Sequence, residues 1–211
     1  MFLCAAALAA AVGTVRQLAA GENAARLVPT LAVNICLLVL LLIEATLIVS
    51  RSRALAKAPG IRSRMTALIG TWVIFLVVFL PIRVDLPIVI YDLAALLCIV
   101  GDMLAIYVVL HLGGSYSIMA EARSPVSSGP YALVRHPLYL AEQIALLGAL
   151  ITYLSWPAVA LFSLQSCFQF MRARNEERVL ARTFPAYANY MRRTPMLVPR
   201  GSNPWSRDQG R

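Results

Sequence analysis

The side chains best suited to chemistry stand together in the stretch SSGPYALVRHPLYLAEQ, residues 127–143. Arg135 and His136 directly precede Pro137, and a helix is predicted to begin there because proline is favoured at the first helical position. The N–H groups and dipole of a helix N-terminus attract carboxylates and phosphates. An arginine adds a forked donor for the same groups. The pattern therefore predicts an anion-binding site at the start of this helix.

Three polar residues follow on one face of that predicted helix. Tyr139, Glu142 and Gln143 share it by the i, i+3, i+4 rule. A glutamate near or within lipid is costly and normally faces a cavity or a partner. The alternative is a headgroup anchor, in which Arg135 and His136 hold the membrane surface and Glu142 pairs with a nearby arginine.

A second charged cluster lies downstream, in the segment RARNEER. Arg172 and Glu176 are spaced as an i, i+4 ion pair, and Glu177 lies on a neighbouring helical face. The alternative is an ordinary solvated amphipathic helix with surface ion pairs. The residues after it are predicted to form aromatic turns that contain Tyr187 and Tyr190.

The elements that carry these clusters are apolar. Of 211 residues, 60% are hydrophobic and 14% are charged, and the mean hydropathy is +0.72. This composition predicts an all-α, polytopic membrane helical bundle of about five to six membrane segments, with a cytoplasmic C-terminal helix and a cofactor pocket. The predicted segments are roughly Phe2–Val15, Val28–Val49, Met65–Ile82, Ile88–Leu112, Leu138–Tyr153 and Pro157–Phe170.

The last two segments are short. At 1.5 Å per residue they reach about 24 Å and 21 Å, less than a hydrocarbon core of about 30 Å. They are predicted to form a tilted or shallow helical hairpin. An amphipathic helix is predicted after it.

The basic residues indicate the topology. The net charge is +9, residues 51–64 carry five basic residues and no acid, and residues 171–211 carry nine arginines against three acids. Basic loops beside apolar spans mark the cytoplasmic side, so both polar clusters are expected there, in a bacterial inner membrane. Neither nucleic-acid binding nor a disulfide framework or metal site is expected.

The motifs resemble a known family. Gly129-Pro130-Tyr131, Arg135-His136-Pro137 with Tyr139, and Glu176-Glu177 with the aromatic ending resemble the isoprenylcysteine carboxyl methyltransferases. The broader group includes the phospholipid N-methyltransferases. The resemblance covers about residues 113–199 and implies a membrane-embedded methyltransferase that uses S-adenosyl-L-methionine. The chain has no GxGxxG motif of the soluble dinucleotide-binding folds.

The resemblance also implies residue roles. The implied cofactor-binding residues are Tyr131, Arg135, His136, Tyr139, Glu176 and Glu177. Arg172 would orient the acceptor, and Glu142 or Glu177 would serve as a base where one is needed. The implied organisation is membrane helices over 1–112, a cofactor-binding core over 113–199 and a polar tail over 200–211.

The acceptor is expected to be a lipophilic small molecule or a lipid-like molecule that enters from the bilayer, and membrane lipids are expected around the helices. A carboxylate acceptor is favoured because it needs no general base, whereas a thiol or amine must lose a proton. One alternative is an NADPH-dependent sterol-type membrane reductase, which shares the Arg-His-Pro helix start. Another is a non-enzymatic small transporter built on Glu44, Asp92 and Asp102. The oligomeric state is left open.

Overall fold

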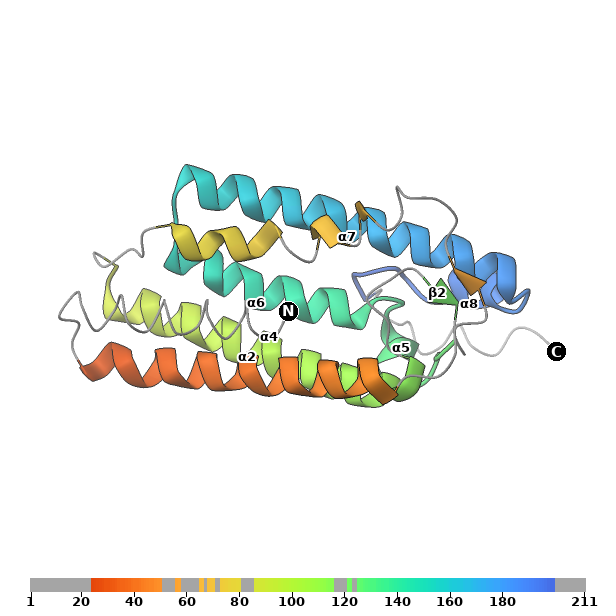
Figure 1. The fold of residues 1–211 in the computed structure, drawn as a ribbon, viewed down its shortest axis with the longest axis horizontal. Coiled ribbons are helices and arrows are strands. Elements are labelled where there is room, and N and C mark those ends of the chain that lie inside the picture. Colours follow the sequence, from red (N-terminus) through yellow and green to blue (C-terminus); the bar gives the residue numbers. More distant parts are fainter. Residues whose placement is uncertain are drawn as a thin grey trace, which may run out of the picture.

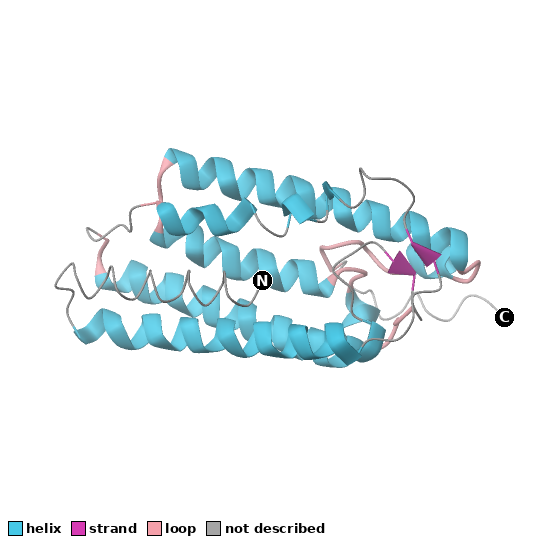
Figure 2. Cartoon of the chain, viewed as in Figure 1, coloured by secondary structure: helices cyan, strands magenta, loops and turns pink. Residues whose placement is uncertain are grey.

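The computed structural model describes residues 24–50, 56–57, 65–66, 68–70, 73–80, 86–115, 121–122 and 125–199. Figure 2 shows that this part of the chain is almost entirely helical, with one two-strand ladder at one end. The predicted all-α class is therefore confirmed for the described residues. The predicted segment Phe2–Val15 and the tail 200–211 lie outside them.

Two helices are long and apolar enough to cross a membrane. Helix α2 spans Ala24–Ser50 and helix α4 spans Ile88–Leu112, close to the segments predicted from hydropathy. They are the two in the described part of the chain that meet this criterion, by length and composition. The predicted five to six membrane segments are thus not shown. The segment predicted at Leu138–Tyr153 is shorter than a span, the one at Pro157–Phe170 belongs to a longer helix that does not meet the criterion, and the others lie partly or wholly outside the described residues.

Small residues bring α4 against helix α6, Pro137–Thr152. A Cβ atom added at Gly101 would lie 2.4 Å from the backbone nitrogen of Ala145, and one added at Gly148 would lie 2.4 Å from the carbonyl oxygen of Ala94. Glycine lets two helix backbones approach this closely. The α4–α6 interface is therefore closed at the level of the main chain, and α2 packs on the other side of α4.

Helix α7, Trp156–Thr183, follows α6 after a tight turn. Ser155 caps it by accepting a hydrogen bond from the N–H of Ala158 at 3.3 Å, and Pro157 occupies its first turn, as predicted. The predicted boundary at Phe170 is wrong. The second arm and the amphipathic helix form one helix of 28 residues, about 42 Å long, because no helix-breaking residue separates them.

The segment Met65–Ile82 is only partly described. Residues 65–66 and 68–70 are helical, and the 3₁₀ helix η1 spans Val73–Phe79 and packs on α7. A Cβ atom added at Gly70 would lie 3.0 Å from Cβ of Phe168, so this segment also approaches α7 closely.

The loops predicted to share one side of the membrane meet at one end of the bundle (Figure 1). Strand β1, Ala56–Lys57, pairs antiparallel with strand β2, Glu121–Ala122, and both contact α7. The short helices gathered at this end are η2 (Gly113–Ser115), α5 (Pro130–Leu133) and α8 (Tyr187–Arg193).

Helix α5 begins after Gly129, whose φ is 57°. This is the left-handed region that favours glycine. A Cβ atom there would also lie 2.5 Å from the imidazole of His111. The end of α4 and the turn that leads into α5 are thus in direct contact.

Candidate functional site

The segment that links α5 and α6 forms backbone hydrogen bonds with residues near the end of the described chain. The N–H of Arg135 donates to the carbonyl of Pro195 at 2.8 Å, and the N–H of His136 donates to that of Met196 at 3.1 Å. His136 is the N-cap residue of α6 and Pro137 follows in its first turn. The predicted helix start is confirmed.

The Arg135 guanidinium ties three elements together. Its Nε donates to Oε1 of Glu177 at 2.7 Å, and its Nη1 donates to the carbonyls of Met191 at 2.9 Å and Thr194 at 2.6 Å. Bonds that involve a charged group are roughly twice as strong as neutral ones. Arg135 therefore joins the start of α6 to α7 and to the end of α8.

Glu177 accepts from two partners through one oxygen. Nε2 of His136 lies 3.1 Å from Oε1, the atom that also accepts from Arg135. Burial opposes ionisation of this carboxyl group, but the hydrogen bonds from His136 and Arg135, and their charges, outweigh it. The pKa of Glu177 therefore lies below its usual value.

A second cluster stands beside the first. Tyr139 donates its hydroxyl to Oε1 of Glu176 at 2.6 Å, and Nε of Arg172 donates to the same oxygen at 3.2 Å. The Arg172 guanidinium also lies over the Tyr139 ring, 5.2 Å from its centroid. The rings of His136 and Tyr139 stack with centroids 5.3 Å apart and planes 7° apart, so the two clusters are continuous.

Buried tyrosines close the site toward the tail. The Tyr190 hydroxyl donates to the carbonyl oxygen of Tyr131 at 2.6 Å, and the Tyr187 and Tyr190 rings lie 5.4 Å apart. Burial raises the pKa of Tyr190 to about 12, although the Arg135 charge opposes this. Burial raises the pKa of Tyr131 and of Tyr187 as well. All three hydroxyls are neutral at physiological pH.

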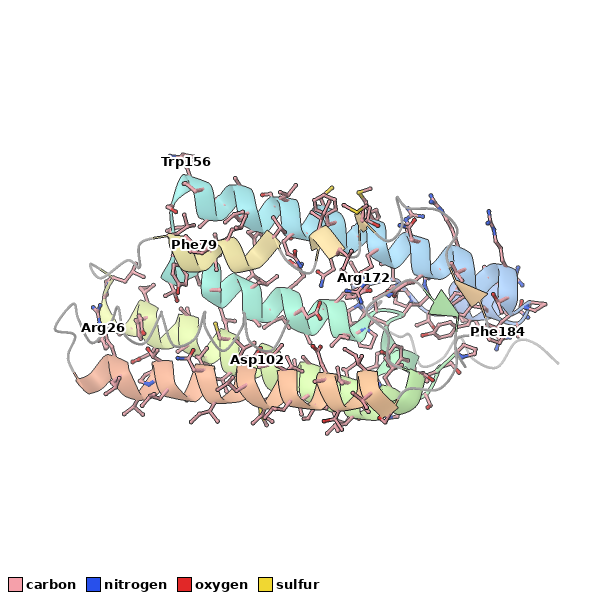
Figure 3. The ribbon with its side chains drawn as sticks, viewed as in Figure 1. Arg26, Phe79, Asp102, Trp156, Arg172 and Phe184 are labelled. Carbon is pink, nitrogen blue, oxygen red and sulfur yellow. The ribbon has the colours of Figure 1, made fainter. Side chains whose placement is uncertain are left out.

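The structure brings the predicted cofactor residues together from α5, α6 and α7. Both Glu176 and Glu177 face the assembly, each toward a different cation. Arg172 occupies the middle of α7, between the apolar half that begins at Trp156 and the end near Phe184 (Figure 3). Glu142, one turn along α6 from Tyr139, accepts instead from the side-chain amide of Gln169.

Sequence reasoning missed the glutamines of α7. Gln165 and Gln169 are both buried and one helical turn apart. Their i, i+4 spacing within an apolar helix is a signal of a shared polar face. The signal was overlooked because both glutamines lie in a segment that was interpreted only as an apolar arm of a hairpin. Of the three acids suspected within the membrane, Glu44 and Asp102 are buried, whereas Asp92 is exposed.

The arrangement defines a class of protein: a helical bundle, with two helices able to cross a membrane, that carries an amphoteric polar site at one end. Within the described residues, no three His, Cys, Asp or Glu side chains are grouped as a metal site. Residues 93–182 match the model of the isoprenylcysteine carboxyl methyltransferase (ICMT) family. This match confirms the resemblance over residues 93–182, which include Arg135, His136 and Glu177 but not the aromatic residues of the tail.

Two curated relatives match shorter stretches. The chain is 38% identical over 87 residues to the cobalt-zinc-cadmium resistance protein CzcN of Cupriavidus metallidurans, covering 38% of this chain and 40% of that protein. It is 34% identical over 76 residues to the nickel-cobalt-cadmium resistance protein NccN of Alcaligenes xylosoxydans xylosoxydans, covering 36% of each. The chain thus matches less than half the length of either relative.

Proposed function

We propose that this protein is an integral-membrane methyltransferase that uses S-adenosyl-L-methionine and acts on a lipophilic acceptor. The observation that carries the proposal is a pair of opposite charges, Arg135 and Glu177, whose groups each have a further atom that can form hydrogen bonds to a ligand. Among the described residues, Arg135 uses Nε and Nη1, and Glu177 uses Oε1. Nη2 and Oε2 are left for the carboxylate and the ammonium of a zwitterionic ligand, and the residues therefore fit this cofactor.

Bound there, the cofactor would supply an electrophilic methyl group on a sulfonium. Arg135 and His136 would hold its amino-acid end with Glu177, while Tyr131 and Tyr139 would flank it and Glu176 would accept from its ribose or ammonium. Buried neutral tyrosines around the site would exclude water. Much of the rate enhancement would come from alignment, for which effective molarities can contribute about 7–11 kcal/mol.

The membrane setting supports a lipid-side acceptor. Helices α2 and α4 have the length and apolarity of membrane spans, and the positive-inside rule favours the cytoplasmic face for the polar site. Arg172 stands where the polar site meets the apolar half of α7 and would orient the acceptor. A carboxylate acceptor, which the sequence favours, would have to approach Glu142 and its acidic neighbours.

Metal binding is a weaker proposal. The names of the two relatives describe metal resistance, and neither names a reaction. The described part of this chain offers no group of three ligating side chains. Methyl transfer accounts for the motif residues that form the site, whereas metal binding leaves them without a role.

The proposal is tested by ligand binding to the detergent-purified full chain. S-adenosylmethionine and S-adenosylhomocysteine should each raise the thermal midpoint, and NADPH should not. A ligand that binds only the folded state stabilises it by about 2.7 kcal/mol at a hundredfold excess over Kd. Stabilisation by NADPH alone would favour the reductase, and stabilisation by none of the three would overturn the cofactor assignment.

A pair of variants on α7 locates the site. Glu177→Gln keeps an oxygen for Arg135 but loses the charge for an ammonium, so affinity for S-adenosylhomocysteine should fall about tenfold. Arg178→Gln is the matched control, because Arg178 is exposed and its side chain donates to Asn175, which lies on the same helix. Equal affinities in the two variants would remove Glu177 from the site.

A further inference from the structure

A chain of hydrogen bonds joins α6 to α7 in the apolar half of the bundle. The Ser166 hydroxyl donates to Oε1 of Gln143 at 3.0 Å, Nε2 of Gln143 donates to Oε1 of Gln169, and Nε2 of Gln169 donates to Oε2 of Glu142. Helices α6 and α7 approach each other far less closely than α4 and α6. Long polar side chains, rather than main-chain contact, therefore hold this interface.

Gln165 lies near this chain of hydrogen bonds in the sequence of α7, but its side-chain oxygen takes no part in it. The residue is 7% exposed, and its Oε1 is buried with no hydrogen-bond partner in the described structure. Gln169 lies one turn further along α7 and faces α6. A buried carbonyl oxygen without a donor destabilises the fold, so such an atom calls for an explanation. A bound ligand with an N–H or O–H group would satisfy it.

The charges that act on Glu142, the carboxylate that accepts from Gln169, are mainly negative. Glu142 interacts electrostatically with Glu44 of α2 and with Glu176, and Asp102 of α4 interacts with Glu142. Arg172 is the cation that acts on Glu142. Carboxylates of α2, α4 and α7 thus lie within electrostatic reach of Glu142 on α6, together with the guanidinium of Arg172. A carboxylate ligand would be repelled there, and a cationic donor would be attracted.

We propose that the methyl acceptor is a lipophilic amine whose nitrogen is held between Gln165 Oε1 and the Glu142 carboxylate. This rests on the proposed methyltransferase function and specifies its substrate class. An ammonium group both donates to the unused carbonyl and offsets the negative charges around Glu142. An alcohol can donate but carries no positive charge, and a carboxylate can do neither. The apolar residues of α6 and α7 suit its hydrocarbon chain.

The reaction then balances with residues of the site. Glu142 takes a proton from the ammonium group, which frees the lone pair on nitrogen. That lone pair forms the new bond to the methyl carbon as the bond from this carbon to sulfur breaks, and the bonding pair stays on sulfur. Glu142 is thus the general base, a role that a carboxylate acceptor would not require.

The test compares three probes with matched chains: oleylamine, oleyl alcohol and oleate, at equal mole fraction in phosphatidylcholine nanodiscs that hold the full chain. The thermal midpoint is measured with and without S-adenosylhomocysteine. Oleylamine should stabilise the protein most and oleate least. In Gln165→Leu the apparent affinity for oleylamine should fall about tenfold, and Gln165→Glu should retain it because an acceptor oxygen remains.

Ser163→Leu is the matched control, since it places a leucine on the exposed side of the same helix. Equal stabilisation by the three probes, or an unchanged response in Gln165→Leu, would overturn the amine assignment and leave water as the partner of Gln165. Binding of S-adenosylhomocysteine should be the same in Gln165→Leu and in the unaltered protein. If that compound binds neither, the methyltransferase proposal fails, whereas the oleylamine result still reports on the Gln165 site.

Discussion

Helix α6 has two faces that are built on opposite principles. Toward α4 it presents small residues, and at Gly148 a single added carbon would lie 2.4 Å from a main-chain oxygen. Toward α7 it presents Tyr139, Glu142 and Gln143, each of which reaches a polar side chain of α7. At the first face the two helix backbones come into close contact beside these glycines, and the second face is joined by hydrogen bonds between side chains.

The contrast between the two faces indicates that one sets the assembly of the bundle and the other can bind a ligand. An interface closed by backbone contact tolerates no added volume, because the surroundings cannot give way without moving a helix. Polar side chains can exchange one partner for another without a shift of the main chain. The α4–α6 face therefore sets how the bundle is assembled. The α6–α7 face is where a ligand can be admitted.

The largest effect is expected where the backbones touch. Gly148→Leu would drive a side chain into Ala94 and Cys98 of α4, and overpacking of this kind typically destabilises by about 1–3 kcal/mol or more. The thermal midpoint and the yield of monodisperse protein should both drop. Leu147→Ala, on the exposed side of the same turn, should change neither, and an equal loss in both would show that the glycine contact is not special.

A smaller effect is expected where α7 meets the tail. Arg135→Lys keeps the positive charge but cannot bond Glu177, Met191 and Thr194 together, since an ammonium lacks the planar fork. The loss of two hydrogen bonds should destabilise the docked tail by about 2 kcal/mol. Chymotrypsin should then cleave faster after Tyr190. Arg193→Lys, at an exposed position, is the control, and equal cleavage rates would contradict the assigned role of Arg135.

The smallest effect appears only in acid. The folded-state pKa of Glu177 is lowered, so its contribution to stability is full above its unfolded value of 4.5 and is lost as pH falls through the folded value. The difference in thermal midpoint between the unaltered protein and Glu177→Gln should be constant from neutral pH to about pH 5 and shrink below that. A difference that changes between pH 6 and 8 would assign the titration to another group.

Local signals predicted a large part of this molecule. Hydropathy located α4 to the residue, the Arg-His-Pro motif located the start of α6, and the i, i+4 spacing of Arg172 and Glu176 predicted an ion pair that forms at 3.2 Å. Hydropathy also ended α7 too early. Its average falls where charged residues begin, although the backbone of a helix continues through them.

By itself, the sequence determined the helical class, the apolar segments and the residue types of the polar site, because periodicity and motif spacing are local properties of the chain. Only the tertiary structure decided which groups are partners. In that structure Arg135 bonds Glu177, and Tyr139 bonds Glu176. Glu142 accepts from Gln169, and Gln165 Oε1 has no donor among the described residues. Partners on separate helices depend on how those helices pack against each other, and the local sequence pattern does not specify that packing.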